Sequence, residues 1–203
     1  GGVSASGISG NKSVSSYGDN DYWVVKYNNA GGIEWQRAYG GSAGDFLTAM
    51  VEANDGGYLL GGSSSSGISG IKTEINLGVT DYWLVRIDSI GNIVWQNTIG
   101  GSSSDAITHL ANTPDGGFIV TGYSFSNISG DKTENGHNFS ADYWILKIDS
   151  LGAIQWQNTI GGNGSDLPLS AYSNADGTCI VAGYSSSGAT GDKTEANLGG
   201  FDF

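Results

Sequence analysis

The sequence predicts an all-β fold made of β-propeller-type repeats, and three observations support this prediction. The tripeptide Asp-Tyr-Trp occurs at residues 21–23, 81–83 and 142–144, so the chain repeats with offsets of 60 and 61 residues. Each unit contains four short apolar-rich runs, in which side chains at alternate positions share one face, as in β-strands. No segment has the 3.6-residue period of an amphipathic helix, so we expect almost no helix.

The middle unit shows the alternation and the turn residues that predict its four strands. In its first strand, Trp83, Val85 and Ile87 lie on one face. Further apolar residues lie on the other face, which fits a sheet packed between two neighbouring sheets. Segments rich in Gly, Ser, Asn and Asp separate the strands and supply turn chemistry. The predicted strands of this unit are residues 82–88, 93–99, 105–111 and 117–123.

The repeats predict a partial propeller of three four-stranded antiparallel blades within one repeat domain, residues 1–203. Closed propellers typically have about four to eight blades, so we expect the remaining blades to come from the same protein or from further copies. A β-solenoid is the second interpretation, although its coils are usually shorter, and an aligned sandwich of hairpins is the third. The predicted divisions are an inter-blade loop at 1–20, blades at 21–62, 81–123 and 142–184, and the start of a next unit at 185–203.

Composition excludes several classes of site and partner. Cys179 is the single cysteine, so neither a disulfide framework nor a cysteine-based zinc site can form within one chain. The net charge of −12 argues against binding to nucleic acids and anionic membranes, because both are polyanions. No apolar stretch approaches the roughly 20 residues of a membrane span, so we expect no membrane insertion.

The order of motifs within a unit resembles a known family. Each unit runs from Asp-Tyr-Trp through Gly-Asn-Ile-x-Trp-Gln, Ile-Gly-Gly and Asp-Gly-Gly to Gly-Tyr-Ser, with small variations. Over the whole chain this is similar to the tandem propeller repeats of large secreted and cell-surface proteins of Bacteroidetes, especially flavobacteria. The resemblance implies an extracellular or outer-surface adhesin or scaffold. It also implies export by the type IX secretion system, although the separate sorting domain of such proteins is not in this sequence.

The long loops form the predicted binding face, because loops on a rigid scaffold often carry function. In a four-stranded blade, the links after the second and fourth strands emerge on the same face, and here these are the longest links. The loop after the fourth strand carries a recurring Lys-Thr-Glu motif. The alternative interpretation is that each lysine pairs with a nearby acid and orders its loop. The candidate ligand-binding residues are Lys72, Glu74, Lys132, Glu134, Lys193 and Glu195.

Acidic side chains in the same loops suggest calcium as the one cofactor to consider, because hard cations take several oxygen ligands. The spacing does not match an EF-hand, and Asn11 and Ile71 replace the first acid in two copies. The candidate metal-binding residues are Asp131, Glu134, Asp192 and Glu195. Another set of repeated acids opens a strand and is interpreted as turn-capping: Asp45, Asp105 and Asp166.

Six tryptophans recur at two positions of the repeat, twelve residues apart. Both positions alternate with apolar residues, so we interpret them as the structural core of the repeat, and a sugar-stacking set is the alternative. They are Trp23, Trp83 and Trp144 at the first position and Trp35, Trp95 and Trp156 at the second.

Catalysis has little support in the sequence. His109 and His137 occupy non-equivalent positions, and no serine lies in a Gly-x-Ser-x-Gly elbow followed by a helix. The expected function is therefore a non-catalytic scaffold or adhesin-like module that contacts a protein or glycan at the cell surface. The alternatives are a propeller-type hydrolase or lyase acting on polysaccharide, and a secreted cargo or subunit within a larger surface machine.

Overall fold

The computed structural model describes residues 1–203 and contains thirteen β-strands and no helix. Strands of the middle unit lie within one residue of their predicted bounds. The structure contains no helix that is long and apolar enough to cross a membrane. The strands are β1 (Gly2–Ser4), β2 (Asp21–Tyr27), β3 (Ile33–Tyr39), β4 (Asp45–Glu52), β5 (Tyr58–Ser64), β6 (Asp81–Ile87), β7 (Ile93–Ile99), β8 (Asp105–Asn112), β9 (Phe118–Ser124), β10 (Asp142–Ile148), β11 (Ile154–Ile160), β12 (Asp166–Ser173) and β13 (Cys179–Ser185).

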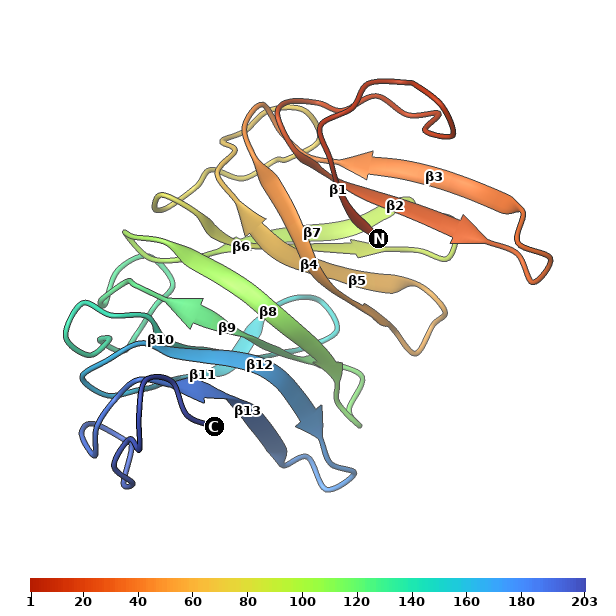
Figure 1. Cartoon of the computed structure of the whole chain (residues 1–203). Coiled ribbons are helices and arrows are strands. Elements are labelled where there is room, and N and C mark those ends of the chain that lie inside the picture. The colour runs from red at the N-terminus through yellow and green to blue at the C-terminus, as the bar shows by residue number, and fades with distance from the viewer.

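The strands form four antiparallel sheets stacked side by side along the chain (Figure 1). Two sheets are complete four-stranded meanders, in the orders β4-β5-β6-β7 and β8-β9-β10-β11. The flanking sheets are partial, with β1-β2-β3 at the N-terminal end and β12-β13 at the C-terminal end. The chain is therefore a partial β-propeller, as its sequence predicts.

The predicted blade boundaries were wrong by two strands. β5 pairs with β6 along its whole length, from Tyr58 opposite Ile87 to Ser64 opposite Asp81. The long loop at 65–80 therefore joins neighbours inside one sheet, and the sheets begin at β4 and β8 instead of at residues 21, 81 and 142.

The two terminal divisions also need correction. Residues 1–20 include β1, which pairs with β2, and Asp202 in the last segment forms a bridge with Ser185 at the end of β13. A repeating sequence does not show which strand begins a sheet, because the same pattern of strands results whichever strand is counted first. The hydrogen-bonded pairs alone set where a blade starts.

The Asp-Tyr-Trp motif joins each sheet to the next. Tyr82 is fully buried, its ring lies 4.9 Å from that of Trp144, and its hydroxyl donates to the Trp144 carbonyl over 3.1 Å. Tyr22 makes the same contacts with Trp83, at 4.8 Å between rings and 3.0 Å to the carbonyl. Each repeat thus places an aromatic anchor in the core of its neighbour, which fixes the stacking of the sheets.

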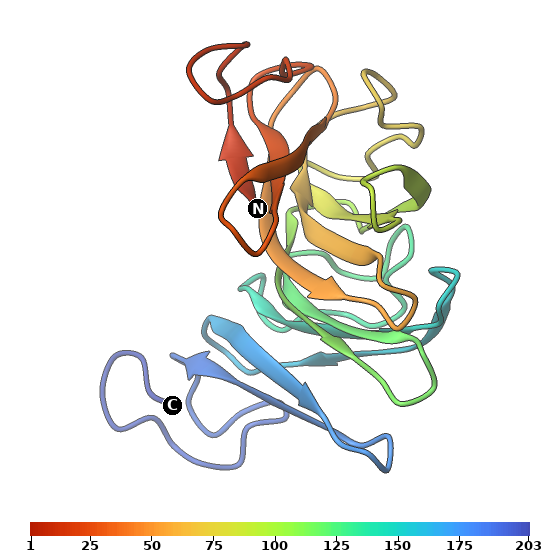
Figure 2. The same cartoon turned by 90° about the vertical axis from the view of Figure 1, so that its right-hand side faces the viewer.

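The connections separate into two faces, as the sequence predicts. The long-loop face carries the loops at 65–80 and 125–141 together with the links between sheets, such as residues 100–104. The short-turn face carries the tight turns within each sheet, such as residues 53–57 and 88–92. In Figure 1 the long loops lie on the left and the short turns on the right, and Figure 2 shows the partial C-terminal sheet from the side.

Candidate binding clefts

The lysines predicted to bind ligand on the long-loop face are buried. Lys72 and Lys132 are each 1% exposed, and burial lowers the pKa of Lys72 and brings that of Lys132 to about 8. The Lys132 ammonium donates to the Thr159 hydroxyl and lies 5.1 Å from the Trp144 ring. The Lys72 ammonium donates to the Glu74 carbonyl over 2.8 Å. These side chains fix their loops through a carbonyl and a hydroxyl, and the predicted ion pair with a nearby acid is not formed by either lysine.

The glutamates of the same motif hold the loop to the outer strand of the sheet. Glu74 accepts a hydrogen bond from the Thr98 amide, and Glu134 accepts one from the Thr159 amide over 2.5 Å. In the last copy, Lys193 donates to the Ser187 carbonyl over 2.8 Å, and Glu195 is exposed. Asp192 and Lys193 line a pocket of about 220 Å³ beside the C-terminal partial sheet, so ligand contact at these motifs stays a prediction.

The candidate calcium residues also bond to backbone amides. Asp131 accepts a hydrogen bond from the Gly100 amide, and Asp192 accepts one from the Gly161 amide, both over 3.2 Å. The structure holds no group of three or more His, Cys, Asp or Glu side chains placed to bind a metal ion. The acids of these loops therefore attach each loop to the link between sheets.

The repeated acids that open the inner strands are turn caps, as predicted. The Asp105 carboxylate is fully buried and accepts hydrogen bonds from the Gly101 amide over 2.8 Å and the Ser126 hydroxyl over 3.1 Å. Asp45 and Asp166 make the same pair of bonds in their repeats. Each of these three carboxylates thus uses its Oδ2 atom to hold the backbone and a serine of the long-loop face.

The tryptophans serve two structural roles. Trp83 and Trp144 are fully buried core residues, and the Trp144 indole donates to Gln157 over 3.0 Å. The outer tryptophans link sheets instead. Trp35 donates to the Ser89 carbonyl of the next sheet over 3.3 Å, and Trp95 donates to the Ser150 carbonyl over 3.1 Å. Trp23 is half-buried, and Trp156 is 43% exposed.

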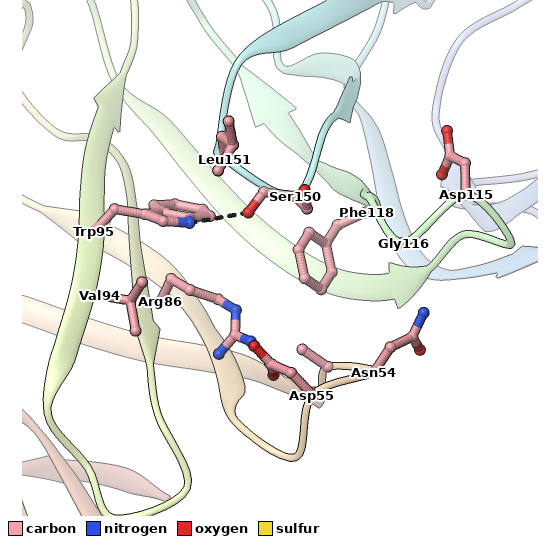
Figure 3. Close-up of a pocket in the computed structure, with 11 residues that line it drawn as sticks. Asn54, Asp55, Arg86, Val94, Trp95, Asp115, Gly116, Phe118, Ser150 and Leu151 are labelled. Carbon is pink, nitrogen blue, oxygen red and sulfur yellow. Dashed lines mark hydrogen bonds and ion pairs between the residues drawn. The ribbon is translucent and has the colours of Figure 1, made fainter.

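The short-turn face contains a cleft between the two complete sheets, which we call cleft I (Figure 3). It has a volume of about 350 Å³, which lies in the range of small-ligand sites. Trp95 and Leu151 lie on one side of it, and the Arg86–Asp55 pair lies on the other. The lining residues are Ala53, Asn54, Asp55, Arg86, Val94, Trp95, Asp115, Gly116, Phe118, Ser150 and Leu151.

An ion pair lines one side of cleft I. The Arg86 guanidinium bonds to the Asp55 carboxylate and donates to the Tyr58 carbonyl over 3.3 Å. The Arg86 side chain is 6% exposed and that of Asp55 is 71% exposed, so the acid covers the base. The Gly57 amide and the Arg86 guanidinium lower the pKa of Asp55. The pair therefore stays ionised and offers carboxylate oxygen to the solvent side.

The same arrangement recurs between the third and fourth sheets, in what we call cleft II. It has a volume of about 390 Å³ and contains Asp115, Lys147, Trp156, Asp176 and Gly177 in place of Asp55, Arg86, Trp95, Asp115 and Gly116. Asp115 therefore lines cleft I and also provides the ion pair of cleft II.

Asp115 shows this double role directly. Lys147 lies 3.0 Å from the Asp115 carboxylate and is largely buried. The Thr113 hydroxyl and Lys147 lower the pKa of Asp115 to about 2. In Figure 3 the Asp115 carboxylate points away from cleft I. The charge of Asp115 is therefore balanced within its own sheet.

Trp95 and Trp156 were predicted as repeat core, with sugar stacking as the alternative. The turn aspartates of the clefts, and the basic residues on the strands that pair with them, were not predicted as a site. The sequence does contain a signal for these ion pairs, because a basic residue recurs at positions 26, 86 and 147 and an Asp recurs at positions 55, 115 and 176. Their pairing depends on β5 and β6 being neighbours, which the predicted blade boundaries did not allow.

Comparisons with known proteins agree with the repeat architecture. The chain is 21% identical to an uncharacterized WD repeat-containing protein of Acanthamoeba polyphaga mimivirus, over 86% of this chain. The matched region spans 15% of the length of that relative. No family model matches the chain. The likeness supports a β-propeller-like repeat and leaves the bacterial group and the export route as predictions.

Proposed function

We propose that this chain is a non-catalytic binding scaffold of the extracellular space or outer cell surface, and that its ligand sites are clefts I and II. The observation that carries the proposal is the recurrence of one cleft geometry, with an ion pair, a tryptophan and a second aspartate, at two sheet boundaries. Equivalent sites on a rigid repeat raise the avidity for a repeating or surface-bound partner. The surface location rests on the resemblance of the repeats to those of secreted proteins.

The clefts lack the acid that glycoside hydrolysis needs. Such enzymes use two carboxyl groups, one of which has a raised pKa so that it is protonated near neutral pH. Asp55 and Asp115 line cleft I, and hydrogen bonds together with their cations lower the pKa of both. The aspartates with a raised pKa line neither cleft; they are Asp21, Asp81, Asp105, Asp131 and Asp142. These facts favour binding over polysaccharide cleavage.

The test uses the whole chain immobilised on beads. The beads are exposed to two coated surfaces: cell-envelope material treated with protease, which leaves polysaccharide, and the same material treated with periodate, which leaves protein. The cleft variant carries Val94→Arg and Gln155→Arg, because both positions are exposed at the edge of a cleft. The matched control is Asn127→Arg, an exposed position on the long-loop face.

We expect retention of the beads on at least one surface, loss of retention in the double cleft variant, and normal retention in the control. No low-mass sugar or peptide is expected in the supernatant. Release of soluble reducing sugar would show catalysis and end the proposal. Loss of retention in the control variant alone would move the site to the long-loop face and also contradict it.

A further inference from the structure

We infer that each cleft binds a neutral sugar residue, with an apolar ring face against the tryptophan and with hydroxyl groups bonded to the turn side chains. This inference rests on the proposed function and adds the chemical class of the ligand.

The apolar half of cleft I fits the C–H face of a sugar ring. Trp95 is half-buried and lines the cleft beside Phe118, while Val94 is 60% exposed at its edge. A Cβ added at Gly152 of the next sheet would lie 3.1 Å from the six-membered ring of Trp95, so little space is left on that side of the indole. The indole is thereby fixed in place before any ligand arrives, which reduces the entropy lost on binding.

The polar half of cleft I retains hydrogen-bonding groups that the protein does not use. The Asp55 bonds to Arg86 and to the Gly57 amide all use Oδ1, which leaves Oδ2 free to accept. Asn54 is exposed and its side-chain amide makes no hydrogen bond within the chain. A carboxylate oxygen accepts from hydroxyl donors and an amide both donates and accepts, so together they suit a ligand rich in hydroxyl groups.

The charges of cleft I favour a neutral ligand. Arg86 is neutralised by Asp55, and Asp115 is neutralised by Lys147 outside the cleft. An anionic ligand would find no free cation here and would approach a chain of net charge −12. A cationic ligand would find both carboxylates already paired. A neutral sugar meets neither penalty.

Cleft II repeats this chemistry with a different residue at two positions of its lining. Pro114 stands where Asn54 stands in cleft I, and Gln155 stands where Val94 stands. Gln155 is exposed and its side chain makes no hydrogen bond within the chain. Each cleft therefore keeps one free amide. In cleft I it lies across from Trp95, and in cleft II it belongs to the residue that precedes Trp156 in the chain, so mutation can distinguish the two clefts.

The test is calorimetric titration of the whole chain with neutral gluco-, manno- and galacto-oligosaccharides, and with dextran sulfate as the polyanion. For one sugar residue per cleft we expect two sites with Kd on the order of a millimolar. Asn54→Ala and Gln155→Ala each remove one free amide, and each is expected to weaken one of the two sites about tenfold. Asn127→Ala, an exposed amide on the long-loop face, is the matched control and leaves both sites unchanged.

The outcomes separate this inference from the proposed function. If no neutral oligosaccharide binds, or if only dextran sulfate binds, the ligand class is wrong. The binding scaffold then still stands, provided that the bead assay shows retention on the periodate-treated surface. If oligosaccharides bind but only Asn127→Ala weakens them, the clefts are not the sites, and both conclusions fail.

Discussion

The two faces of this protein differ in what their polar groups do. On the long-loop face, Lys72, Lys132 and Asp105 are buried and bond to their own loop, to strand β11 and to a link between sheets, respectively. On the short-turn face, Asp55 and Asn54 are exposed and keep unused hydrogen-bonding capacity. Loop length predicted the long-loop face as the binding face, whereas the proposed clefts lie on the short-turn face, because a long polar loop uses many of its side chains to satisfy its own backbone. Tight turns satisfy their backbone locally and leave side chains free.

The largest effect that would test this contrast is expected from Lys132→Ala. The change leaves nearby buried carboxylates without their cation and removes the contacts to Thr159 and Trp144, so we expect a loss of roughly 3 kcal/mol in the free energy of unfolding. Urea denaturation followed by circular dichroism measures it.

The control for Lys132→Ala is Lys193→Ala at the same repeat position. Lys193 is only half-buried and makes one carbonyl bond, so its loss is expected to cost about 1 kcal/mol. If Lys132→Ala unfolds no more easily than Lys193→Ala, the long-loop lysines are not structural, and the contrast between the faces fails. Sugar binding in the clefts is expected to be unchanged in both variants.

A smaller effect is expected from Gly152→Ala on the short-turn face. Gly152 has a φ of +88°, and an added Cβ would lie 3.1 Å from the Trp95 ring. We expect a loss of about 2 kcal/mol and a change in the fluorescence of Trp95. The control is Gly177→Ala, which has a φ of +87° and no neighbour within 4 Å of the added Cβ, so it reports backbone strain alone at about 1 kcal/mol. Equal losses would show that Trp95 is not rigidly held.

The smallest effect is expected from the pH dependence of stability, and its sign differs between the faces. Hydrogen bonds and Lys147 lower the pKa of Asp115 to about 2, so its stabilising contribution is complete above the ordinary pKa and is lost as the pH falls toward 2. Burial raises the pKa of Asp142 to about 6, so its contribution is complete at acid pH and is lost as the pH rises through 6.

The measurement compares urea midpoints across pH for the native chain, Asp115→Asn and Asp142→Asn. Asp115→Asn is expected to flatten the profile below about pH 4, by less than about 1 kcal/mol because the side chain is largely solvent-exposed. Asp142→Asn is expected to flatten the profile between about pH 4 and pH 7. Parallel profiles for all three proteins would contradict both assignments.

The sequence by itself determined the strands, the turns and the repeat. These are local properties: alternation fixes the strand at 93–99, and a Pro-Asp-Gly turn places the start of the next strand at 117, one residue before the observed start at Phe118. The sequence also predicted the turn caps such as Asp105, because a capping side chain bonds to a backbone amide four residues away.

Tertiary structure alone decided which strands share a sheet and which side chains meet. Arg86 and Asp55 are 31 residues apart, and Lys132 and Thr159 are 27 apart, so neither contact follows from a local pattern. Both depend on β-strand pairing between segments whose repeat has no intrinsic starting point. Once β5 pairs with β6, the turn carboxylate reaches the strand cation and the loop lysine turns inward. The cleft and the buried lysine are therefore two consequences of one choice of strand pairing.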